Sequence, residues 1–505
     1  MESLPTELLT HIFHFGLPTT LFGERIPPQL LAAVCPRWRH LIHAFPEFWT
    51  DIRVHDANFT PNAAYLVDQH IILSKEEPLH ISLRTNDVSQ RGQAHFLAVI
   101  SKLLSAPVIS RWHSVRLQLT NTHLEMLHPF GRRAPSNVEY LELRLLHGRF
   151  ANEPSRIFEL RRNPPQRFRS TISFGAMPRL KTLIAQRVEL DVLSAPFATE
   201  LTTLAFNWCL APGFCVKLVA DIQAQVSAHA EAAAAKEPDA ERPTTPPPLP
   251  NPALRTLRLG GPIPQSIKSS PDLRDSFLRC ITTLELASTP AQDFDPFAGA
   301  ILAMRATLAE LRLNTVLLPS FILALNGTPA VPNPQVSWPP PVFTELRTLY
   351  INACEWSPGM TQQLSTLFPG VHTLLLRSIH FPSRTAQGRH MNATSFLLSL
   401  KSNVFPELRA LHLVEMAFGL DRLVELVAAR QAHASAQAQA HVFHNANAAQ
   451  PASKDASQSQ SQLQSHGGDL RPLDMILVVE QPPVVNISAL RSLRQNLREF
   501  RMVAA

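Results

Sequence analysis

The sequence predicts a mixed α+β / α/β repeat fold, in which a short all-helical module precedes an irregular array with a curved parallel sheet. Three observations lead to this prediction. The first 55 residues carry apolar side chains at helical spacing, and a short apolar motif recurs from about residue 79 to the end of the chain. The 505 residues also include 44 prolines but only 17 glycines, a composition that favours many short, punctuated elements.

The N-terminal segment predicts an amphipathic helix. Leu8 and Ile12 lie four residues apart. The same spacing separates Leu9 from Phe13, so the two rows form one broad apolar stripe on a helix. Pro5 presets the backbone angle for the first helical turn.

A second group of helices follows. Pro36 cannot lie inside a helix, so we expect one helix to end near Cys35 and another to begin near Pro36. A segment of this size cannot bury all of its apolar surface on itself, so the surplus faces a partner or the rest of the chain. A plain helical hairpin that caps a larger domain is the alternative interpretation. The further apolar residues are Leu30, Leu31, Val34, Trp38, Leu41, Ile42, Phe45, Phe48 and Trp49.

Three stretches together resemble the F-box, the helical module that joins a protein to a Skp–cullin ubiquitin ligase. They are LPTELLTHIF at 4–13, VCPRWRHLI at 34–42 and PEFW at 46–49. The stretch Gly16–Pro28, which contains three prolines, departs from the family because it replaces a short acidic turn. The resemblance implies that a Skp-family adaptor contacts Leu4, Pro5, Leu8, Leu9, Ile12, Phe13, Val34, Cys35 and Trp38.

A second pattern, L-x-x-L-x-L, recurs beyond this segment. Its last two apolar residues have period two, so both side chains point to one face of a strand. Leu180–Leu183 is a partial copy, and Leu79–Leu83 and Val115–Leu119 are expected to be early strands of the same array. The complete copies are Val138–Leu143, Leu201–Phe206, Leu254–Leu259, Ile281–Leu286, Leu308–Leu313, Leu346–Ile351, Val371–Leu376, Leu408–Leu413 and Leu497–Met502.

These copies resemble leucine-rich repeats. Leu257, Leu284 and Leu311 follow one another at intervals of 27 residues, which is within the range of that family. The family's next landmark, Asn or Cys three residues after the motif, is met by Cys209 and Cys354. Other copies lack it, so the array is degenerate. Because one unit cannot bury its strand alone, stacked units would share a core under a curved parallel sheet; unrelated strands in an α/β sheet are the alternative.

The same patterns set the expected boundaries. We expect an F-box at 1–55, a connecting segment with the first strand at 56–110, degenerate repeats at 111–430 and a terminal repeat at 471–505. Two stretches, 226–250 and 431–470, have too few apolar residues to offset the entropy of ordering, so we expect disordered inserts there. Helices between strands are expected at Phe214–Val226, Phe297–Arg305, Met360–Leu367 and Leu420–Arg430.

Composition and motifs give no support for an enzyme. The net charge of +6 is not gathered into a basic block, so we expect no nucleic-acid partner. The five cysteines are scattered and form no C-x-x-C pair, so we expect neither disulfides nor a zinc site. No phosphate-loop, dinucleotide, zinc-protease or serine-hydrolase motif occurs, so we expect no catalytic residue, metal or cofactor. Without a signal peptide or a membrane-length apolar stretch, we expect a cytoplasmic and/or nuclear protein and no membrane contact.

The two resemblances together imply a non-catalytic substrate-recognition subunit of a Skp–cullin–F-box ubiquitin ligase. The adaptor would connect the chain to a cullin and a RING subunit, and the repeats would hold an unknown target protein. A leucine-rich-repeat scaffold acting outside a ligase is one alternative, and an enzyme or RNA-binding function without a recognisable motif is another. Residues between the buried leucines should line the concave sheet, although a merely solvated face explains them equally well. These target-binding candidates are Arg258, Glu285, Arg312, Tyr350, Arg377 and His412.

Overall fold

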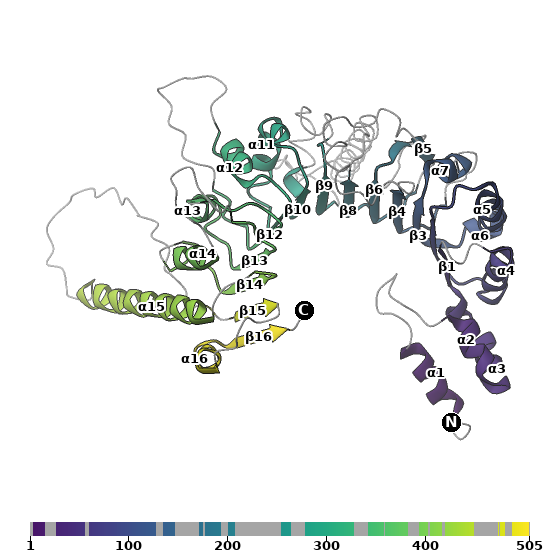
Figure 1. Ribbon diagram of the computed structural model, residues 1–505, viewed down its shortest axis with the longest axis horizontal. Coiled ribbons are helices and arrows are strands. Elements are labelled where there is room, and N and C mark those ends of the chain that lie inside the picture. The colour runs from purple at the N-terminus through teal and green to yellow at the C-terminus, as the bar shows by residue number, and fades with distance from the viewer. Residues whose placement is uncertain are drawn as a thin grey trace, which may run out of the picture. The chain divides into compact units, whose positions relative to one another are not determined.

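The computed structural model describes residues 4–15, 27–55, 60–127, 135–146, 171–174, 177–192, 200–207, 254–263, 278–327, 342–357, 359–381, 393–401, 404–416, 420–448, 473, 475–479 and 487–503 (Figure 1). The chain divides into two compact units. Unit 1 comprises Met1–Thr256 with Pro264–Ser266, and unit 2 comprises Leu257–Ile263 with Ile267–Ala505. In unit 2 and in the first part of unit 1, parallel strands alternate along the chain with helices, so the chain has a repeat-like α/β architecture.

Unit 1 begins with short helices whose ends are set by prolines. Pro28 and Pro36 each lie in the first turn of a helix, where a missing N–H costs nothing. Cys35 separates these helices, and its Sγ accepts a hydrogen bond from the backbone N–H of Trp38 at 3.5 Å. The predicted break at Pro36 is therefore confirmed. The elements are α1 (Thr6–Phe15), α2 (Pro28–Val34), α3 (Pro36–Ala44) and the 3₁₀-helix η1 (Pro46–Trp49).

A parallel sheet follows in unit 1, with the order β1-β2-β3-β4-β6-β8. Figure 1 shows the helices α4, α5 and α7 on one side of the strands β1 to β4. A separate parallel pair is formed by β5 (Thr171–Phe174) and β7 (Glu189–Val192). The sheet strands are β1 (Asp51–His55), β2 (Leu79–Thr85), β3 (Trp112–Leu119), β4 (Tyr140–Leu145), β6 (Thr182–Gln186) and β8 (Thr203–Asn207). The helices are α4 (Ala63–Leu73), α5 (Gln90–Leu103), α6 (Ala106–Ile109) and α7 (Asn121–Leu127).

Unit 2 continues the same scheme with the strand order β9 to β16. Figure 1 shows α11 to α14 on one side of β10 to β14. The strands are β9 (Thr256–Gly260), β10 (Thr283–Ala287), β11 (Glu310–Asn314), β12 (Thr348–Asn352), β13 (Thr373–Arg377), β14 (Ala410–Val414), β15 (Met475–Val479) and β16 (Glu499–Val503). The helices are η6 (Leu278–Cys280), η7 (Ala291–Asp293), α11 (Phe294–Ala303), α12 (Leu318–Asn326), α13 (Met360–Leu367), α14 (Ala393–Ser399), α15 (Leu420–Ala448) and α16 (Ile487–Asn496).

The recurring motif explains this arrangement. Its second leucine lies in register from strand to strand, as in the pairs Leu284–Leu311 and Leu349–Leu374. These side chains are 0% exposed, because period two directs them all to the face that the helices cover. The other face of the sheet carries mainly polar residues. Stacking thus converts a sequence repeat into a continuous core.

Four consecutive strands of unit 2 also end in the same way. Ser288, Thr315, Ala353 and Ser378 follow β10, β11, β12 and β13, and all have a positive φ of 46–51°. Their backbone N–H groups donate to the carbonyl of the last residue of the next strand, at 2.8–3.0 Å. The chain therefore turns in the same way after each of these four strands, although no glycine marks these positions. The backbone turn thus recurs along the chain together with the leucine motif.

Two expected boundaries were wrong, and one strand was missed. The sheet begins at β1, inside the segment assigned to the helical module, because Trp49, Ile52 and Val54 form one more, less obvious copy of the motif. β15 was missed for a similar reason, since Leu473 leads into a continuously apolar strand. The helix expected to end at Arg430 continues to Ala448, so the first part of the expected 431–470 insert is helical. Ala and Gln fill that stretch, and both favour helix.

Other expectations lie outside the described residues. These are the helix at Phe214–Val226, the insert at 226–250, the remainder of the 431–470 insert and most of Gly16–Pro28. The helix Met360–Leu367 is confirmed, and Phe297–Arg305 corresponds to α11 with shifted ends. Within the described ranges, a search for membrane-spanning helices finds none of sufficient length and apolarity.

A buried histidine at the start of α7 predicts acid sensitivity. His123 is 0% exposed and contacts Thr120 Oγ1 through Nδ1 at 2.7 Å. Burial lowers the pKa of His123, an effect that Asp87 partly opposes. The unfolded chain therefore takes up a proton near the ordinary histidine pKa of about 6.5, while the folded chain does so only at lower pH. Stability should fall as the pH drops below about 6.5, by up to about 1.4 kcal/mol per pH unit.

The variant His123→Gln tests this prediction. Urea unfolding at pH 7.5 and 5.5 should show a smaller loss of stability in the variant than in the wild type, because the variant cannot take up this proton. Equal losses in the two proteins would contradict the assignment.

Candidate protein-binding sites

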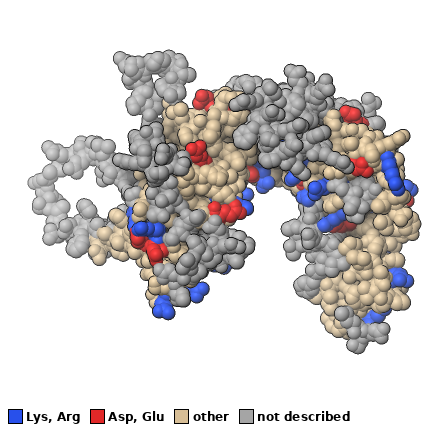
Figure 2. Space-filling view, in the orientation of Figure 1, with Lys and Arg blue, Asp and Glu red and all other residues tan. Residues whose placement is uncertain are grey.

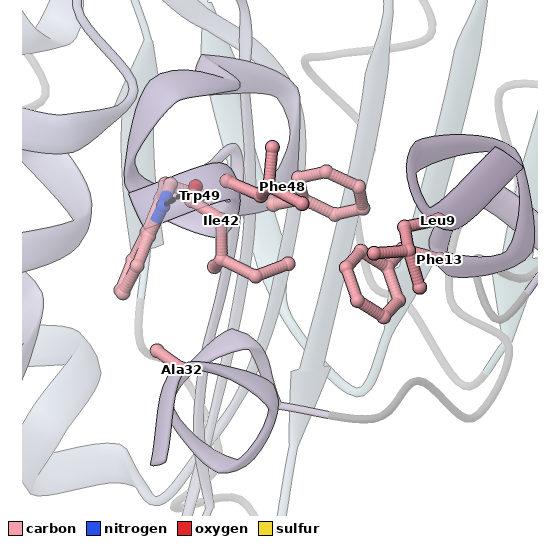
Figure 3. Close-up of a cluster of buried hydrophobic side chains, with 7 residues drawn as sticks. Leu9, Phe13, Ala32, Ile42, Phe48 and Trp49 are labelled. Carbon is pink, nitrogen blue, oxygen red and sulfur yellow. Dashed lines mark hydrogen bonds between the residues drawn. The ribbon is translucent and has the colours of Figure 1, made fainter. Parts of the chain in front are cut away.

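The N-terminal helices bury one row of the apolar stripe. Leu9 and Phe13 are 1% and 5% exposed. They belong to one hydrophobic cluster with Ala32 of α2, Ile42 of α3 and Phe48 of η1. Figure 3 shows Leu9 and Phe13 pointing from α1 toward Ile42 and Phe48. The short helices thus share a core of their own.

This core contacts α4, the first helix after strand β1. His70 of α4 donates from Nδ1 to the carbonyl of Trp49 at 3.0 Å. Its Nε2 accepts from the side-chain amide of Gln29 on α2 at 2.7 Å. The rings of Trp49 and His70 also pack edge to face, with centroids 5.2 Å apart, and Leu73 packs against the cluster. A buried histidine therefore fixes how the N-terminal helices lie on α4.

The other row of the stripe faces outward. Leu8 and Ile12 of α1 are 51% and 52% exposed, and Leu30 and Val34 of α2 are 62% and 60% exposed. We call these four residues the exposed apolar set. Each pair is four residues apart and so shares one face of its helix. Figure 2 shows few charged side chains on the part of the molecule formed by α1 to α3. Apolar side chains exposed in this way on short helices are typical of a protein-binding surface.

The predicted adaptor contacts divide between these two environments. Leu8, Ile12, Val34 and Pro5 are exposed. Leu4, Cys35 and Trp38 are half-buried. Leu9 and Phe13 lie in the hydrophobic cluster instead, so their direct contact with the adaptor stays a prediction. Leu30 was recognised as apolar but was not assigned to the surface, since its outward orientation depends on how α2 packs.

The exposed apolar set contributes a bounded amount of binding energy. Full burial of a large apolar side chain is worth about 1.5–3 kcal/mol. Because somewhat more than half of each of these four side chains is exposed, covering them would contribute roughly 3–6 kcal/mol in total. Association itself costs about 4–15 kcal/mol. A stable complex therefore needs further contacts around the set.

A second candidate surface is the polar face of the unit 2 sheet. The register places Glu285, Arg312, Tyr350, Leu375 and His412 in one row across β10 to β14. The row begins at Arg258 of β9, whose Nε lies 3.4 Å from Glu285 Oε2. Five of the six predicted candidates therefore lie together. Arg377 instead lies in the next row, beside Asn352 and Val414.

Most charges on this face are already paired. Arg312 Nε donates to Glu310 Oε1 at 2.7 Å. Arg377 Nη2 donates to Glu415 Oε1, also at 2.7 Å, and the hydrogen bonds of Glu415 with Arg377 and Ser378 lower the pKa of its carboxyl group. Exposed pairs of this kind add little to stability. A binding partner would therefore meet a balanced, hydrogen-bonded surface.

Two neighbouring residues of this row, Tyr350 and Leu375, differ in character from the ion pairs. Tyr350 and Leu375 lie side by side and are both half-buried, so they offer an apolar contact among charged neighbours. The next residue, His412, is also half-buried, and burial lowers the pKa of its imidazole. In the described surroundings, His412 Nε2 has no hydrogen-bond partner. Leu375 was not among the predicted candidates because an apolar residue between two leucines does not look like a surface position.

In the described ranges, a search for groups of three or more potential metal ligands finds none. No protein-family model matches the chain, and no curated protein matches its sequence. The geometry of the two surfaces is therefore the basis for any functional conclusion.

Proposed function

We propose that the chain is a substrate-recognition subunit of a Skp–cullin–F-box ubiquitin ligase. The observation that carries the proposal is the exposed apolar set, which lies on the helices that resemble an F-box. The same helices keep their own core. Their exposed residues are thus not needed for folding and are available to an adaptor.

The repeat-like α/β array supports the second half of the proposal. It would be a degenerate leucine-rich-repeat solenoid, with the motif leucines inside and the polar rows outside. The row from Arg258 to His412 would contact the target protein, and Tyr350 with Leu375 would supply the apolar anchor. Aromatic residues at the centre of a polar surface are frequent anchors in interfaces.

The mechanism requires no chemistry from this chain. The adaptor would link α1 and α2 to a cullin and a RING subunit, while the repeats hold the target. Tethering raises the concentration of the target near the ubiquitin-charged enzyme. The chain would accelerate ubiquitin transfer only by positioning the target.

The proposal is tested by the affinity of the full-length chain for a purified Skp-family adaptor. We expect the double variant Leu8→Ser/Ile12→Ser to bind about 10–100-fold more weakly, because two half-exposed side chains account for about 1.5–3 kcal/mol. Isothermal titration calorimetry measures the change. The matched control is Leu317→Ser/Leu323→Ser, which alters two apolar residues of unit 2 that are 49% and 59% exposed.

Three outcomes separate the readings. Weaker binding in the first variant and unchanged binding in the control support the proposal. Unchanged binding in both variants means that the adaptor contacts another surface. If the wild-type chain does not bind the adaptor at all, the ligase function is wrong and a repeat scaffold acting outside a ligase becomes the better account.

A further inference from the structure

Helix α4 presents one row of side chains to the N-terminal helices. Leu66, His70 and Leu73 are four and three residues apart, so they share one side of the helix. His70 contacts Gln29 of α2 at 2.7 Å, and Leu73 packs against the hydrophobic cluster of the N-terminal helices. Leu66, the third member of the row, is 42% exposed. This side of α4 therefore continues beyond the part that the N-terminal helices cover.

The exposed leucines of α2 and α4 lie near the same hydrogen bond. Leu30 directly follows Gln29, and Leu66 precedes His70 by one helical turn, a rise of about 6 Å. Figure 1 shows α4 next to α2 in unit 1. Because Gln29 contacts His70, the α2 side of this junction carries Leu30 and the α4 side carries Leu66. The exposed apolar set therefore borders on α4.

Tyr65 enlarges the apolar surface on α4. It precedes Leu66 in the first turn of the helix and is 63% exposed. The stretches Ala63–Val67 and Pro28–Val34 contain no charged residue. A partner at the junction would therefore meet an uncharged surface with two large exposed leucines and an aromatic ring. Aromatic side chains are frequent anchors in protein interfaces, and an apolar partner surface is the complementary one.

Energetics and position both favour the adaptor as the partner that covers this surface. The four side chains of the exposed apolar set offset at best the lower part of the cost of association. More covered apolar area close to the set is therefore needed for a stable complex. Helix α4 packs on the side of the sheet that the buried leucines face, whereas the proposed contacts to the target lie on the polar face. A partner already bound to α2 can reach Leu66 without crossing the sheet.

We propose that the adaptor-binding surface extends from the exposed apolar set onto α4, where Tyr65 and Leu66 contact an apolar part of the Skp-family adaptor. The inference rests on the proposed function, because it names further residues of the same interface. It also gives the junction a role. The contact between Gln29 and His70 and the packing of Leu73 hold α2 and α4 in one arrangement, so that a single partner binds both helices.

The affinity of the full-length chain for a purified Skp-family adaptor, measured by isothermal titration calorimetry, tests the extension. We expect Leu66→Ser and Tyr65→Ser each to weaken binding about 3–10-fold, because each removes a large side chain whose exposed part the adaptor would cover. If Leu66→Ser fails to fold, Tyr65→Ser carries the test, since the side chain of Tyr65 is mostly in solvent.

Helix α5 offers a matched control. Leu97 is 43% exposed, almost the same fraction as Leu66. Lys102 of α5 pairs with Asp68 of α4 at 2.8 Å, and Leu97 precedes Lys102 by five residues. It therefore points about 140° away from the side of α5 that contacts α4. We expect Leu97→Ser to change the affinity for the adaptor by less than twofold.

The outcomes keep the extension apart from the proposed function. Weaker binding of Leu66→Ser and Tyr65→Ser, with unchanged binding of Leu97→Ser, supports the extension. If both α4 variants bind like the wild type while Leu8→Ser/Ile12→Ser loses affinity, the extension alone is wrong. A wild-type chain that does not bind the adaptor overturns both proposals.

Two further results would also overturn the extension. An equal loss of affinity in Leu97→Ser would mean that the effect is not confined to the α2–α4 junction. A wild-type chain that sediments as a dimer, with Leu66→Ser sedimenting as a monomer, would assign the surface to a second copy of this chain instead.

Discussion

Replacing Phe13 by alanine is expected to destabilise the N-terminal helices by about 3–5 kcal/mol, the range for removing a buried phenylalanine side chain. The ring of Phe13 lies edge-on to Trp38, with centroids 4.7 Å apart, and packs near Phe48 at 6.3 Å. Its loss leaves a cavity where α1, α3 and η1 meet. Hydrogen exchange measured by mass spectrometry on peptides from 4–15 and 27–50 should show faster opening of these helices.

The neighbouring residue gives a matched control. Ile12 is 52% exposed, so Ile12→Ala should change the opening rate little while it weakens adaptor binding. Phe13→Ala should affect both. If Ile12→Ala opened the helices as strongly as Phe13→Ala, the division into a buried and an exposed row would be incorrect.

The second large effect is expected at Arg430, whose guanidinium is 0% exposed. It donates to the carbonyls of Val404 at 3.1 Å and Phe405 at 2.9 Å, and reaches that of Leu400 at 3.4 Å. Burial lowers the pKa of Arg430 to about 10. Arg430→Ala would leave buried acceptors without a donor, each at a cost of about 1–3 kcal/mol, so we expect unit 2 to lose roughly 3–5 kcal/mol.

Urea unfolding followed by hydrogen exchange in strands β13 and β14 measures this loss. Arg422 lies on the same helix but is exposed, with Nη1 2.8 Å from Glu425 Oε1. Arg422→Ala should therefore change the free energy of unfolding by less than about 1 kcal/mol. Similar effects of the two substitutions would show that Arg430 does not hold α15 to the loop that precedes β14.

The sequence alone predicted the strands well because the motif is also a physical constraint. A leucine at positions such as Leu284 and Leu311 must face the helices, and parallel stacking then brings equivalent residues into register. The helix boundary at Pro36 was equally clear, since a proline ring excludes a helix interior. These features depend on local chemistry, so they can be predicted without knowing which elements pack together.

The division of the apolar stripe could not be predicted in the same way. Leu8 and Leu9 are adjacent, and on a helix adjacent residues point in directions about 100° apart. Which of them is buried depends on where α3 and η1 lie, and the sequence does not give that placement. The row of target-binding candidates shows a similar limit, because Leu375 occupies the position in register while Arg377 lies one row away.

The central claim is that α1 and α2 bind the adaptor through the exposed apolar set. Hydrogen exchange of the full-length chain, compared with and without a purified Skp-family adaptor, tests it most directly. We predict slower exchange in peptides covering Thr6–Phe15 and Pro28–Val34, and no change in the strands of unit 2. Slower exchange confined to the strands, with α1 and α2 unchanged at saturating adaptor, would contradict the account.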